Sequence, residues 1–241
     1  MKPHDASRRD FLAVGAALAG VAIAPGILLY AQAKTASEPA SATVRWGMLI
    51  DTTQCTQDCD ACAEACRAEN GLAAPERPTD VQWLRKVELT DRKTGRKAYA
   101  PLMCQHCAEP PCVDVCPTGA SFKRADGIVM VDRHVCIGCR YCMMACPYKA
   151  RSFVHEPQAG QKAATPRGKG CVEACNLCAP RIDRGGIPAC VEACEKTGRR
   201  AIVFGDLNDP SSEISRRIRE VATRALRAEL GLDPGVRYAG L

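Results

Sequence analysis

The chain has 241 residues, which is enough for one moderate domain or two small ones. Only 5% of them are aromatic, so a core built from Leu, Ile and Phe alone looks thin for this length. The net charge of +6 is mild and spread along the chain, without the dense basic stripe that nucleic-acid binders carry. The 17 cysteines are several times ordinary usage, and they occur in clusters.

Residues 1–33 have the features of an export signal. Residues 7–12 (SRRDFL) form a twin-arginine signature, an uncharged stretch follows, and residues 31–33 (AQA) suit signal peptidase, which would make Lys34 the mature N-terminus. An uncleaved membrane anchor is the alternative, because the stretch is about long enough to span a bilayer. Residues 25–26 (PG) interrupt the stretch and favour cleavage. The sequence therefore predicts a periplasmic protein.

The export route bears on the cysteines. A periplasmic chain this rich in cysteine would otherwise indicate a disulfide scaffold, such as an exported binding protein. The twin-arginine system exports folded proteins that usually carry a cofactor already. Insertion of a cofactor in the reducing cytoplasm, before export, therefore reconciles the signal with the thiols.

The first cysteine set follows a predicted strand at residues 44–50 (VRWGMLI). Residues 55–66 read CTQDCDACAEAC, and the four predicted ligands are Cys55, Cys59, Cys62 and Cys66. The spacing C-x3-C-x2-C-x3-C has one residue more than the bacterial ferredoxin run, and Arg67 stands where proline is usual. Free cysteines packed in a helix would not explain this clustering.

The second and third sets each follow a predicted hairpin. One hairpin joins residues 81–89 to 96–102, and the other spans 122–131 around an Asp-Gly turn. The second set, CQHCAEPPCVDVCP, and the third, CIGCRYCMMACP, predict eight ligands: Cys104, Cys107, Cys112, Cys116, Cys136, Cys139, Cys142 and Cys146. The third set fits the ferredoxin run C-x2-C-x2-C-x3-C-P, in which three thiolates wrap one corner of a cluster. Zinc sites place their two cysteine pairs well apart, which argues against zinc.

The fourth set is discontinuous and comes after a predicted cationic loop at residues 156–170. It consists of Cys175, Cys178, Cys190 and Cys194, followed by a predicted strand at residues 202–204. Sixteen cysteines fill four quartets, enough for four 4Fe–4S clusters. Cys171 repeats the local CVEAC pattern, but the four quartets are complete without it. We therefore expect Cys171 to be a free, packed thiol. The alternative is that it exchanges with a ligand of the first or fourth set.

The fourth cysteine of a ferredoxin run ligates the neighbouring cluster. For the middle sets this rule groups Cys104, Cys107 and Cys112 with Cys146, and Cys136, Cys139 and Cys142 with Cys116. The first set must then pair with the fourth, which groups Cys55, Cys59 and Cys62 with Cys194, and Cys175, Cys178 and Cys190 with Cys66. Such clusters would link distant segments and so stabilise a chain whose apolar core is thin.

The C-terminal part predicts a helix that starts at residues 209–213 and runs to about residue 230, with Gly231 as its stop. Its apolar face comprises Ile214, Ile218, Val221, Ala225 and Leu226. The opposite, arginine-rich face indicates solvation, with partner docking as the alternative.

Several further residues suggest roles beside the clusters. His106 lies between two predicted ligands, and a hydrogen bond that supports the site is favoured over a proton carrier or a Rieske-type ligand. Five basic residues surround the third set and either tune a potential, dock a partner or are simply solvated: Arg133, His134, Arg140, Lys149 and Arg151. Trp46 and Trp83 are expected to pack near clusters. No Ser/His/Asp or Cys/His catalytic arrangement and no phosphate-binding loop stands out, so no catalytic residue is predicted.

The stretch PLMCQHCAEPPCVDVCPTGASFKRADGIVMVD, which leads into CIGCRYCMMACPYKARSF, resembles the four-cluster iron–sulfur subunits of complex iron–sulfur molybdoenzymes and related membrane complexes. Within that family, RWGMLID and VFGDLNDPSSEISR resemble the subunits of Dsr membrane complexes, which are linked to dissimilatory sulfur metabolism. The resemblance implies an α+β fold with two nested ferredoxin-like halves, each holding two clusters. We expect residues 34–80 plus 165–205 to form one half, residues 81–156 the inserted half, and residues 206–241 a C-terminal helix and tail.

The resemblance also implies partners and a role. It implies a quinone-reactive, multi-spanning membrane subunit similar to NrfD and a periplasmic multihaem cytochrome c. The expected role is the relay of single electrons, without a substrate site. The rival interpretation is an electron-transfer subunit of a periplasmic molybdopterin oxidoreductase, such as a polysulfide, thiosulfate or nitrite-linked reductase. An enzyme that uses a labile cluster iron as Lewis acid would need a missing thiolate, and the count shows none missing.

Overall fold

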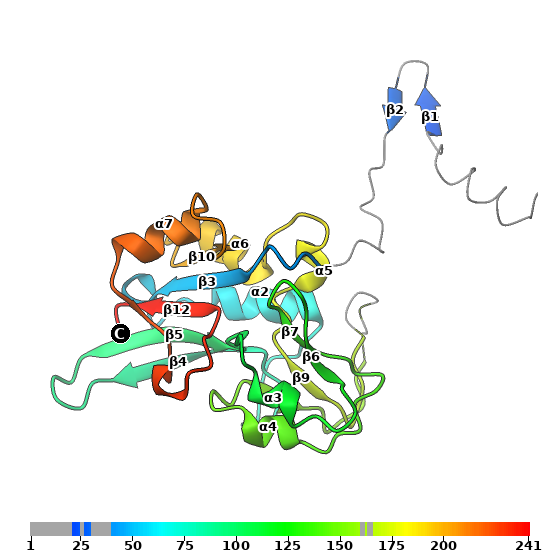
Figure 1. The fold of residues 1–241 in the computed structure, drawn as a ribbon, viewed down its shortest axis with the longest axis horizontal. Coiled ribbons are helices and arrows are strands. Elements are labelled where there is room, and N and C mark those ends of the chain that lie inside the picture. The colour runs from blue at the N-terminus through cyan, green and yellow to red at the C-terminus, as the bar shows by residue number, and fades with distance from the viewer. Residues whose placement is uncertain (1–20, 25–26, 30–39, 160–161, 163–165) are drawn as a thin grey trace, which may run out of the picture. The chain divides into compact units, whose positions relative to one another are not determined.

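The computed structural model describes residues 21–24, 27–29, 40–159, 162 and 166–241 (Figure 1). The chain divides into two compact units, residues 1–38 and 39–241. In the first unit, β1 (Val21–Ala24) pairs with β2 (Ile27–Leu29) in antiparallel fashion. The rest of the predicted export signal lies outside the described residues. None of the helices in the described parts of the chain has the length and apolar character needed to cross a membrane.

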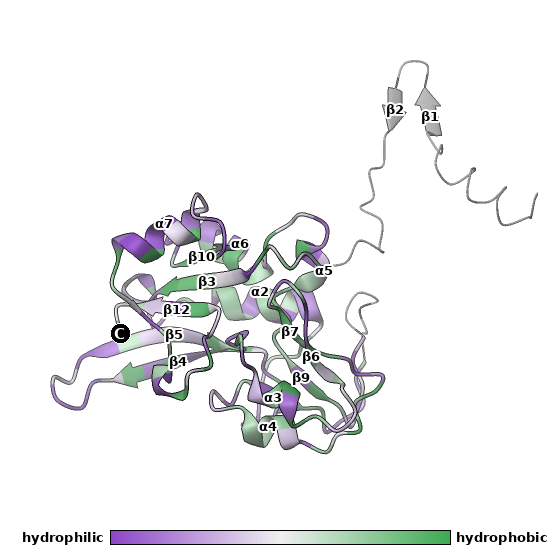
Figure 2. Ribbon diagram, viewed as in Figure 1, coloured by the Kyte–Doolittle hydropathy of each residue, from purple (hydrophilic) through white to green (hydrophobic). Residues whose placement is uncertain are grey.

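A four-stranded sheet organises the second unit. Its order is β10 (Ile202–Asp206), β3 (Trp46–Asp51), β12 (Val236–Ala239) and β11 (Thr223–Arg224). Strand β3 runs antiparallel to β10 and parallel to β12. The residues at positions 48–50 of β3 are almost fully buried, because both faces of this strand are covered. Figure 2 shows β3 as a hydrophobic strand.

The two faces of β3 meet different cores, as the alternation of side chains along a strand requires. Met48 and Ile50 belong to the main core, which contains most of the buried cysteines. Leu49 points to the other face and packs with Ile214 of α7 (Glu213–Glu220). The sheet therefore separates the cysteine-rich side of the unit from the amphipathic helix.

Three two-stranded ribbons complete the strands. They are β4 (Leu84–Thr90) with β5 (Lys97–Met103), β6 (Ser121–Lys123) with β7 (Val129–Val131), and β8 (Arg151–Phe153) with β9 (Val172–Ala174). The first two confirm the hairpins predicted from the sequence. The β4–β5 ribbon is hydrophilic at its far end, where the turn lies (Figure 2). The pairing of β8 with β9 has no counterpart among the predicted elements.

The remaining helices are short. They are η1 (Thr52–Gln54), α2 (Ala61–Asn70), α3 (Pro111–Asp114), α4 (Tyr141–Ala145), α5 (Ala179–Ile182), α6 (Ala189–Lys196) and η2 (Ala228–Leu230). Helices of this length are marginal in isolation, so packing must hold them. Helices α2, α3, α4 and α6 each carry at least one cysteine of the predicted sets.

The prediction for the C-terminal part is wrong beyond Glu220. Helix α7 ends there because Val221 is extended, with φ −121° and ψ 146°. The chain then returns to the sheet as β11 and β12, and Val236 and Tyr238 of β12 are 0% exposed. Burial of two such side chains stabilises the fold by about 1.5–3 kcal/mol each, which a longer, arginine-rich helix would not provide. Residues 206–241 are thus not a helix and a tail.

Two further predicted strands, at residues 44–50 and 202–204, are confirmed as β3 and β10. Within residues 156–170, the described part contains no helix and no strand. Trp83 is buried in the cysteine-rich core, and Trp46 stacks on Phe204 at 5.0 Å between ring centroids. The division into two nested ferredoxin-like halves stays a prediction.

Candidate metal centres

The structure brings the predicted cysteines together in four groups, which we number site 1 to site 4. Site 1 consists of Cys55, Cys59, Cys62 and Cys194, and site 2 of Cys66, Cys175, Cys178 and Cys190. Site 3 consists of Cys104, Cys107, Cys112 and Cys146, and site 4 contains Cys116, Cys136 and Cys142, with Cys139 next to them in the chain. For sites 1 to 3 and for Cys116, Cys136 and Cys142 of site 4, the grouping follows the crossed pattern of the ferredoxin rule. Their role as iron ligands stays a prediction.

Site 1 is a cavity that all four of its cysteines line. Helix α2 supplies Cys62 and helix α6 supplies Cys194, so the packing of α2 on α6 closes the group. Lys86 on β4 secures the loop between the first thiols, because its Nζ donates to Cys59 O at 3.1 Å and pairs with Asp60 at 2.8 Å. A loop held in this way keeps two predicted ligands, Cys55 and Cys59, in place despite the irregular spacer.

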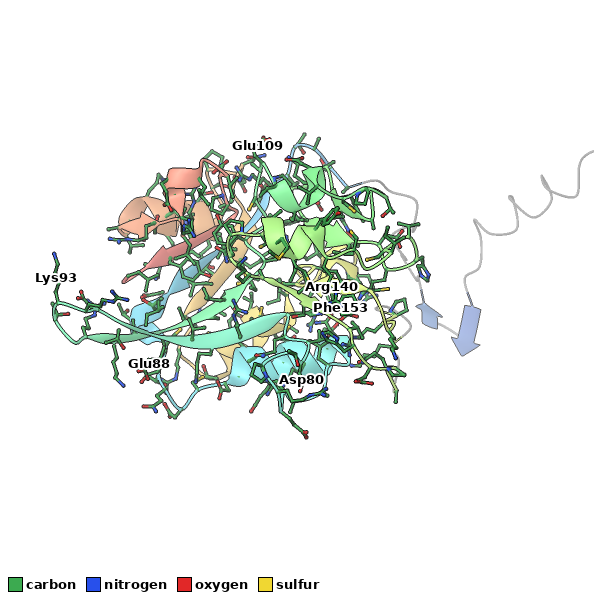
Figure 3. The ribbon with its side chains drawn as sticks, turned by 90° about the horizontal axis from the view of Figure 1, so that it is seen from below. Asp80, Glu88, Lys93, Glu109, Arg140 and Phe153 are labelled. Carbon is green, nitrogen blue, oxygen red and sulfur yellow. The ribbon has the colours of Figure 1, made fainter. Side chains whose placement is uncertain are left out.

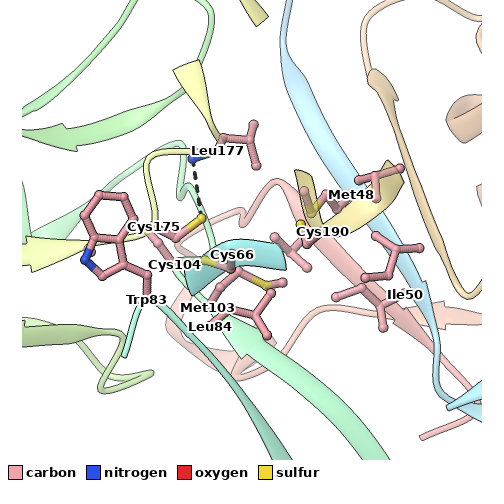
Figure 4. Close-up of a cluster of buried hydrophobic side chains, with 14 of the residues drawn as sticks. Met48, Ile50, Cys66, Trp83, Leu84, Met103, Cys104, Cys175, Leu177 and Cys190 are labelled. Carbon is pink, nitrogen blue, oxygen red and sulfur yellow. Dashed lines mark hydrogen bonds between the residues drawn. The ribbon is translucent and has the colours of Figure 1, made fainter. Parts of the chain in front are cut away.

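Site 2 is an enclosed group, since its four cysteines are all buried, as are those of site 3. Figure 4 shows Cys66 and Cys175 close to each other beside Trp83, with Cys190 on the side of β3. The backbone N–H of Leu177 donates to Cys175 Sγ at 3.4 Å. These apolar surroundings exclude water from the thiols.

Site 3 is a second cavity lined by four cysteines, and the C-terminal segment holds its loop. Ala108 N donates to Asp233 O at 3.0 Å, and Gly235 N donates to Gln105 O at 2.9 Å. Glycine suits position 235, because a Cβ there would make tight contacts, 3.1 Å from Trp46 O and 3.3 Å from His106 O. The segment that the sequence predicts to be a tail therefore supports a candidate metal site.

Site 4 lies at the surface. Its Cys139 is exposed, whereas Cys142 on α4 is buried. The backbone N–H of Ser121 donates to Cys116 Sγ at 3.3 Å. Against the raising effect of burial, this bond and those from Thr118 hold the pKa of Cys116 below its ordinary value. These hydrogen bonds stabilise negative charge on the Cys116 sulfur.

The four sites adjoin one another in numerical order. Burial is the main cause of the raised thiol pKa values, and thiols of the neighbouring site add to it. Cys62 of site 1 is near enough to raise the pKa of Cys66 and of Cys190 in site 2. In the same way, Cys104 of site 3 raises the pKa of Cys175 in site 2. Cys142 of site 4 raises the pKa of Cys112 in site 3. The result is a row of thiol groups from site 1 to the exposed site 4.

The donor sets fit iron–sulfur clusters better than single ions. Among the described residues, no three His, Cys, Asp or Glu side chains converge on the position of one metal ion. Instead, four thiols surround a cavity at sites 1 and 3, as a polyatomic cluster requires. Burial and the neighbouring thiols raise the pKa of Cys62 to about 12, and burial raises that of Cys104 to about 12. Thiolates at such sites need the positive charge of iron.

Backbone N–H groups also point at the sulfurs of the last cysteine in two sets. Ala201 N donates to Cys194 Sγ at 3.2 Å, as Ser121 N does to Cys116 Sγ. In both cases the donor lies just before or at the start of the strand that follows the helix. Such bonds stabilise negative charge on sulfur and tune a cluster's potential.

His106 is buried and does not contact a thiol through its Nδ1. That atom accepts a hydrogen bond from Val129 N at 3.1 Å. Burial lowers the His106 pKa to about 3, so the imidazole is neutral and carries its proton on Nε2. Nε2 has no hydrogen-bond partner among the described residues. A neutral imidazole of this kind does not suit a proton carrier at neutral pH.

The five basic residues around the third set differ in environment. His134, Arg140 and Lys149 are exposed, and Arg140 lies over the Phe153 ring at 3.8 Å (Figure 3). Arg133 faces the Trp83 ring, and Trp83 Nε1 donates to the buried Glu173 at 3.1 Å.

Arg151 alone among these five is buried, at 6% exposure. The sequence pattern groups it with residues that lie at the surface. It begins β8, a strand that is not among the predicted elements, so no signal in the sequence sets it apart.

Cys171 is buried and stands outside site 2. Its thiol donates to Arg133 O at 3.2 Å and lies close to Cys136 of site 4. The sequence suggests the first or fourth set as its possible place of exchange, whereas the structure puts it beside a third-set cysteine. The expectation of a free, packed thiol stays a prediction.

Comparison with known proteins agrees with this chemistry. Residues 96–206 match the family described as a 4Fe-4S dicluster domain, so these residues define an iron–sulfur protein. The chain is 45% identical to the Hdr-like menaquinol oxidoreductase iron-sulfur subunit 1 of Archaeoglobus fulgidus, covering 98% of both chains. It is 38% identical to protein NrfC of Escherichia coli (95% of this chain, 92% of NrfC) and 36% identical to a tetrathionate reductase subunit of Salmonella typhimurium (98% and 89%).

These similarities extend over nearly the whole chain. The chain belongs to the family of iron–sulfur electron-transfer subunits that includes these three relatives.

Proposed function

We propose that this protein is an exported electron-transfer subunit that carries four 4Fe–4S clusters, one at each thiol site. It relays single electrons between a quinone-reactive membrane subunit similar to NrfD and further redox partners, among them a periplasmic multihaem cytochrome c. The observation that carries the proposal is the row of four adjoining thiol groups, which ends at the surface.

The chain's own residues supply the conditions for such a relay. A bound cluster supplies a one-electron redox centre. Sixteen cysteines hold the iron, and backbone N–H groups such as those of Ser121 and Ala201 donate to the ligand sulfurs. The buried side chains around site 2 exclude water. No residue needs to act on a substrate bond, in keeping with a non-catalytic subunit.

The surface around site 4 supports a partner at this end. Cys139 is exposed there, and four large apolar side chains next to it in the chain are exposed as well. They are Val135 (48%), Ile137 (67%), Tyr141 (61%) and Met144 (76%). Apolar side chains at such exposures are typical of interaction sites. The membrane subunit is the partner that we assign to this surface.

Sulfur metabolism is the setting that the sequence supports best. The segments RWGMLID and VFGDLNDPSSEISR resemble DsrO, the periplasmic iron–sulfur subunit of the Dsr membrane complex. The tetrathionate reductase subunit, a relative at 36% identity, also belongs to a sulfur-compound reductase by name. The twin-arginine signature in residues 7–12 supports export to the periplasm.

A second candidate function is the electron-transfer subunit of a periplasmic molybdopterin oxidoreductase. Two similarities favour it, one to the tetrathionate reductase subunit and one, at 38% identity, to a relative in Halobacterium salinarum that is named as a dimethyl sulfoxide reductase iron-sulfur subunit. In that case site 1, at the other end of the row, would face a catalytic molybdenum subunit.

Purification of the native complex distinguishes the two functions. A complex with an NrfD-like subunit and a multihaem cytochrome, without a molybdenum subunit, supports the first. A co-purifying molybdenum subunit decides for the second. A native protein that holds no iron overturns both.

A further inference from the structure

Arg151 is a buried cation between two candidate cluster sites. It begins β8, only 6% of it is exposed, and it lines the cavity of site 3. Its Nη2 donates to Cys112 Sγ at 3.0 Å and to Ser121 Oγ at 2.7 Å. Cys112 belongs to site 3, so the guanidinium directly contacts one of its predicted ligands.

The same guanidinium also acts on site 4. Burial raises the pKa of Cys142, while the charge and N–H groups of Arg151 lower it. Ser121, which accepts from Arg151, also donates its backbone N–H to Cys116 of site 4. Arg151 is therefore linked to thiols of both sites.

The charge of Arg151 has no carboxylate partner among the residues that the structure describes. In the described part of the chain no Asp or Glu forms an ion pair with it, and its Nε and Nη1 are buried without a hydrogen-bonded nitrogen or oxygen. Burial lowers the pKa of Arg151, but three thiols, Cys112, Cys104 and Cys142, raise it above its ordinary value. A buried arginine without a counter-charge is costly, so its compensation must come from the thiolate groups of sites 3 and 4.

We propose that Arg151 is a fixed cation shared by the clusters of sites 3 and 4, which favours the reduced state of both and so raises their reduction potentials. The proposal rests on the proposed function, because it requires clusters at these two sites. Each cluster gains one electron from the relay, and Arg151 neither gains nor loses an electron or a proton. Added negative charge on a cluster is stabilised by a positive charge at short range and low dielectric.

Arg140 provides a matched comparison. It lies next to Cys139 of site 4 in the chain and carries the same charge, but it is exposed and rests on Phe153. Water and salt screen such a charge, so its influence on a cluster is weak. The difference between the two arginines is therefore burial and contact with a ligand sulfur.

The test is an EPR-monitored redox titration of the anaerobically purified, full-length protein and of three variants. Arg151→Met removes the buried charge. Arg151→Lys keeps the charge but lacks the planar guanidinium group. Arg140→Met removes the exposed charge. Iron and acid-labile sulfide are measured on every sample. If the wild-type protein contains no iron, the proposed function itself is wrong. If it contains iron, the comparison of variants tests only the role of Arg151.

We expect Arg151→Met to lower the potentials of two clusters and leave the other two unchanged. At a given applied potential, the ratio of reduced to oxidised cluster should fall at least tenfold. This corresponds to a reduction potential lower by about 59 mV for a one-electron couple. Arg151→Lys should keep most of the wild-type potentials, and Arg140→Met should keep all of them. The proposal is overturned if Arg151→Met titrates like wild type with full iron content, or if Arg140→Met shifts as far. Loss of iron from both Arg151 variants also overturns it, since Arg151 would then be needed for assembly.

Discussion

Cys104 of site 3 lies beside Cys175 of site 2, and its charge adds to the effect of burial in raising the pKa of Cys175 (Figure 4). The two cysteines come from different predicted halves of the chain, with Trp83 buried next to them. This contact joins sites 1 and 2 to sites 3 and 4. If clusters occupy the sites, an electron can cross between the two pairs at this point.

The crossed grouping predicts which cluster a single substitution damages. Cys146→Ser should perturb the cluster of site 3, because Cys146 lines that cavity with Cys104, Cys107 and Cys112. Cys116→Ser, its counterpart, should instead perturb site 4. EPR spectra of the reduced variants provide the measurement, and the two variants should lose different signals. Loss from Cys146→Ser of only the signal that belongs to its own local set, site 4, would refute the crossed grouping.

Cys171 should be dispensable for cluster assembly. It is buried and donates to Arg133 O. Sites 1, 2 and 3 have four cysteines without it, and Cys139 is the predicted fourth ligand of site 4. We expect Cys171→Ser to retain the wild-type iron and sulfide content, whereas Cys175→Ser should lose the cluster of site 2. Iron analysis of both purified variants is the measurement. An iron deficit in Cys171→Ser would make this cysteine a ligand.

The C-terminal strand should stabilise the loop of site 3. The hydroxyl of Tyr238 donates to Pro101 O at 3.1 Å and accepts from Gln105 Nε2 at 3.2 Å, in a fully buried position. Tyr238→Phe removes both hydrogen bonds from a buried position, at a cost of about 1–3 kcal/mol. The urea midpoint of cluster bleaching should fall accordingly. Tyr99→Phe, which loses only exposed hydrogen bonds, should stay close to wild type.

The buried carboxylate of Glu173 should be essential for stability. It accepts from Trp83 Nε1 and pairs with Arg167 at 3.0 Å, and its side chain is fully buried. Glu173→Gln removes one charge of this buried ion pair, and breaking a buried pair typically costs about 3–5 kcal/mol. Glu192→Gln, which breaks solvent-screened pairs with Arg181 and Lys196, should lower the urea midpoint far less. Equal urea midpoints for the two variants would contradict this account.

The cysteine groups can be predicted from the sequence because the spacing of cysteines within a short segment limits which thiols can reach the same cluster. Three thiols within one short segment can bind only around a nearby cluster, and the fourth enters a helix that points away. The structure therefore brings Cys194 to the first set and Cys146 to the second, as the spacing predicts. The hairpins follow equally local turn signals.

The features that the sequence does not predict depend on contacts between distant segments. Strand β12 reads VRYA, with Val236 and Tyr238 alternating with other residues, but a four-residue alternation is too short to identify a strand by itself. Its place beside β3 depends on burial that only the folded chain reveals. Arg151 is similar, because nothing in its neighbouring residues separates a buried arginine from an exposed one such as Arg140.

The central claim is that sixteen cysteines hold four clusters. Iron and acid-labile sulfide, measured per polypeptide on the anaerobically purified native protein, test it most directly. The account predicts about sixteen of each, four per 4Fe–4S cluster. A protein with no iron, or with zinc in place of iron and sulfide, would contradict it.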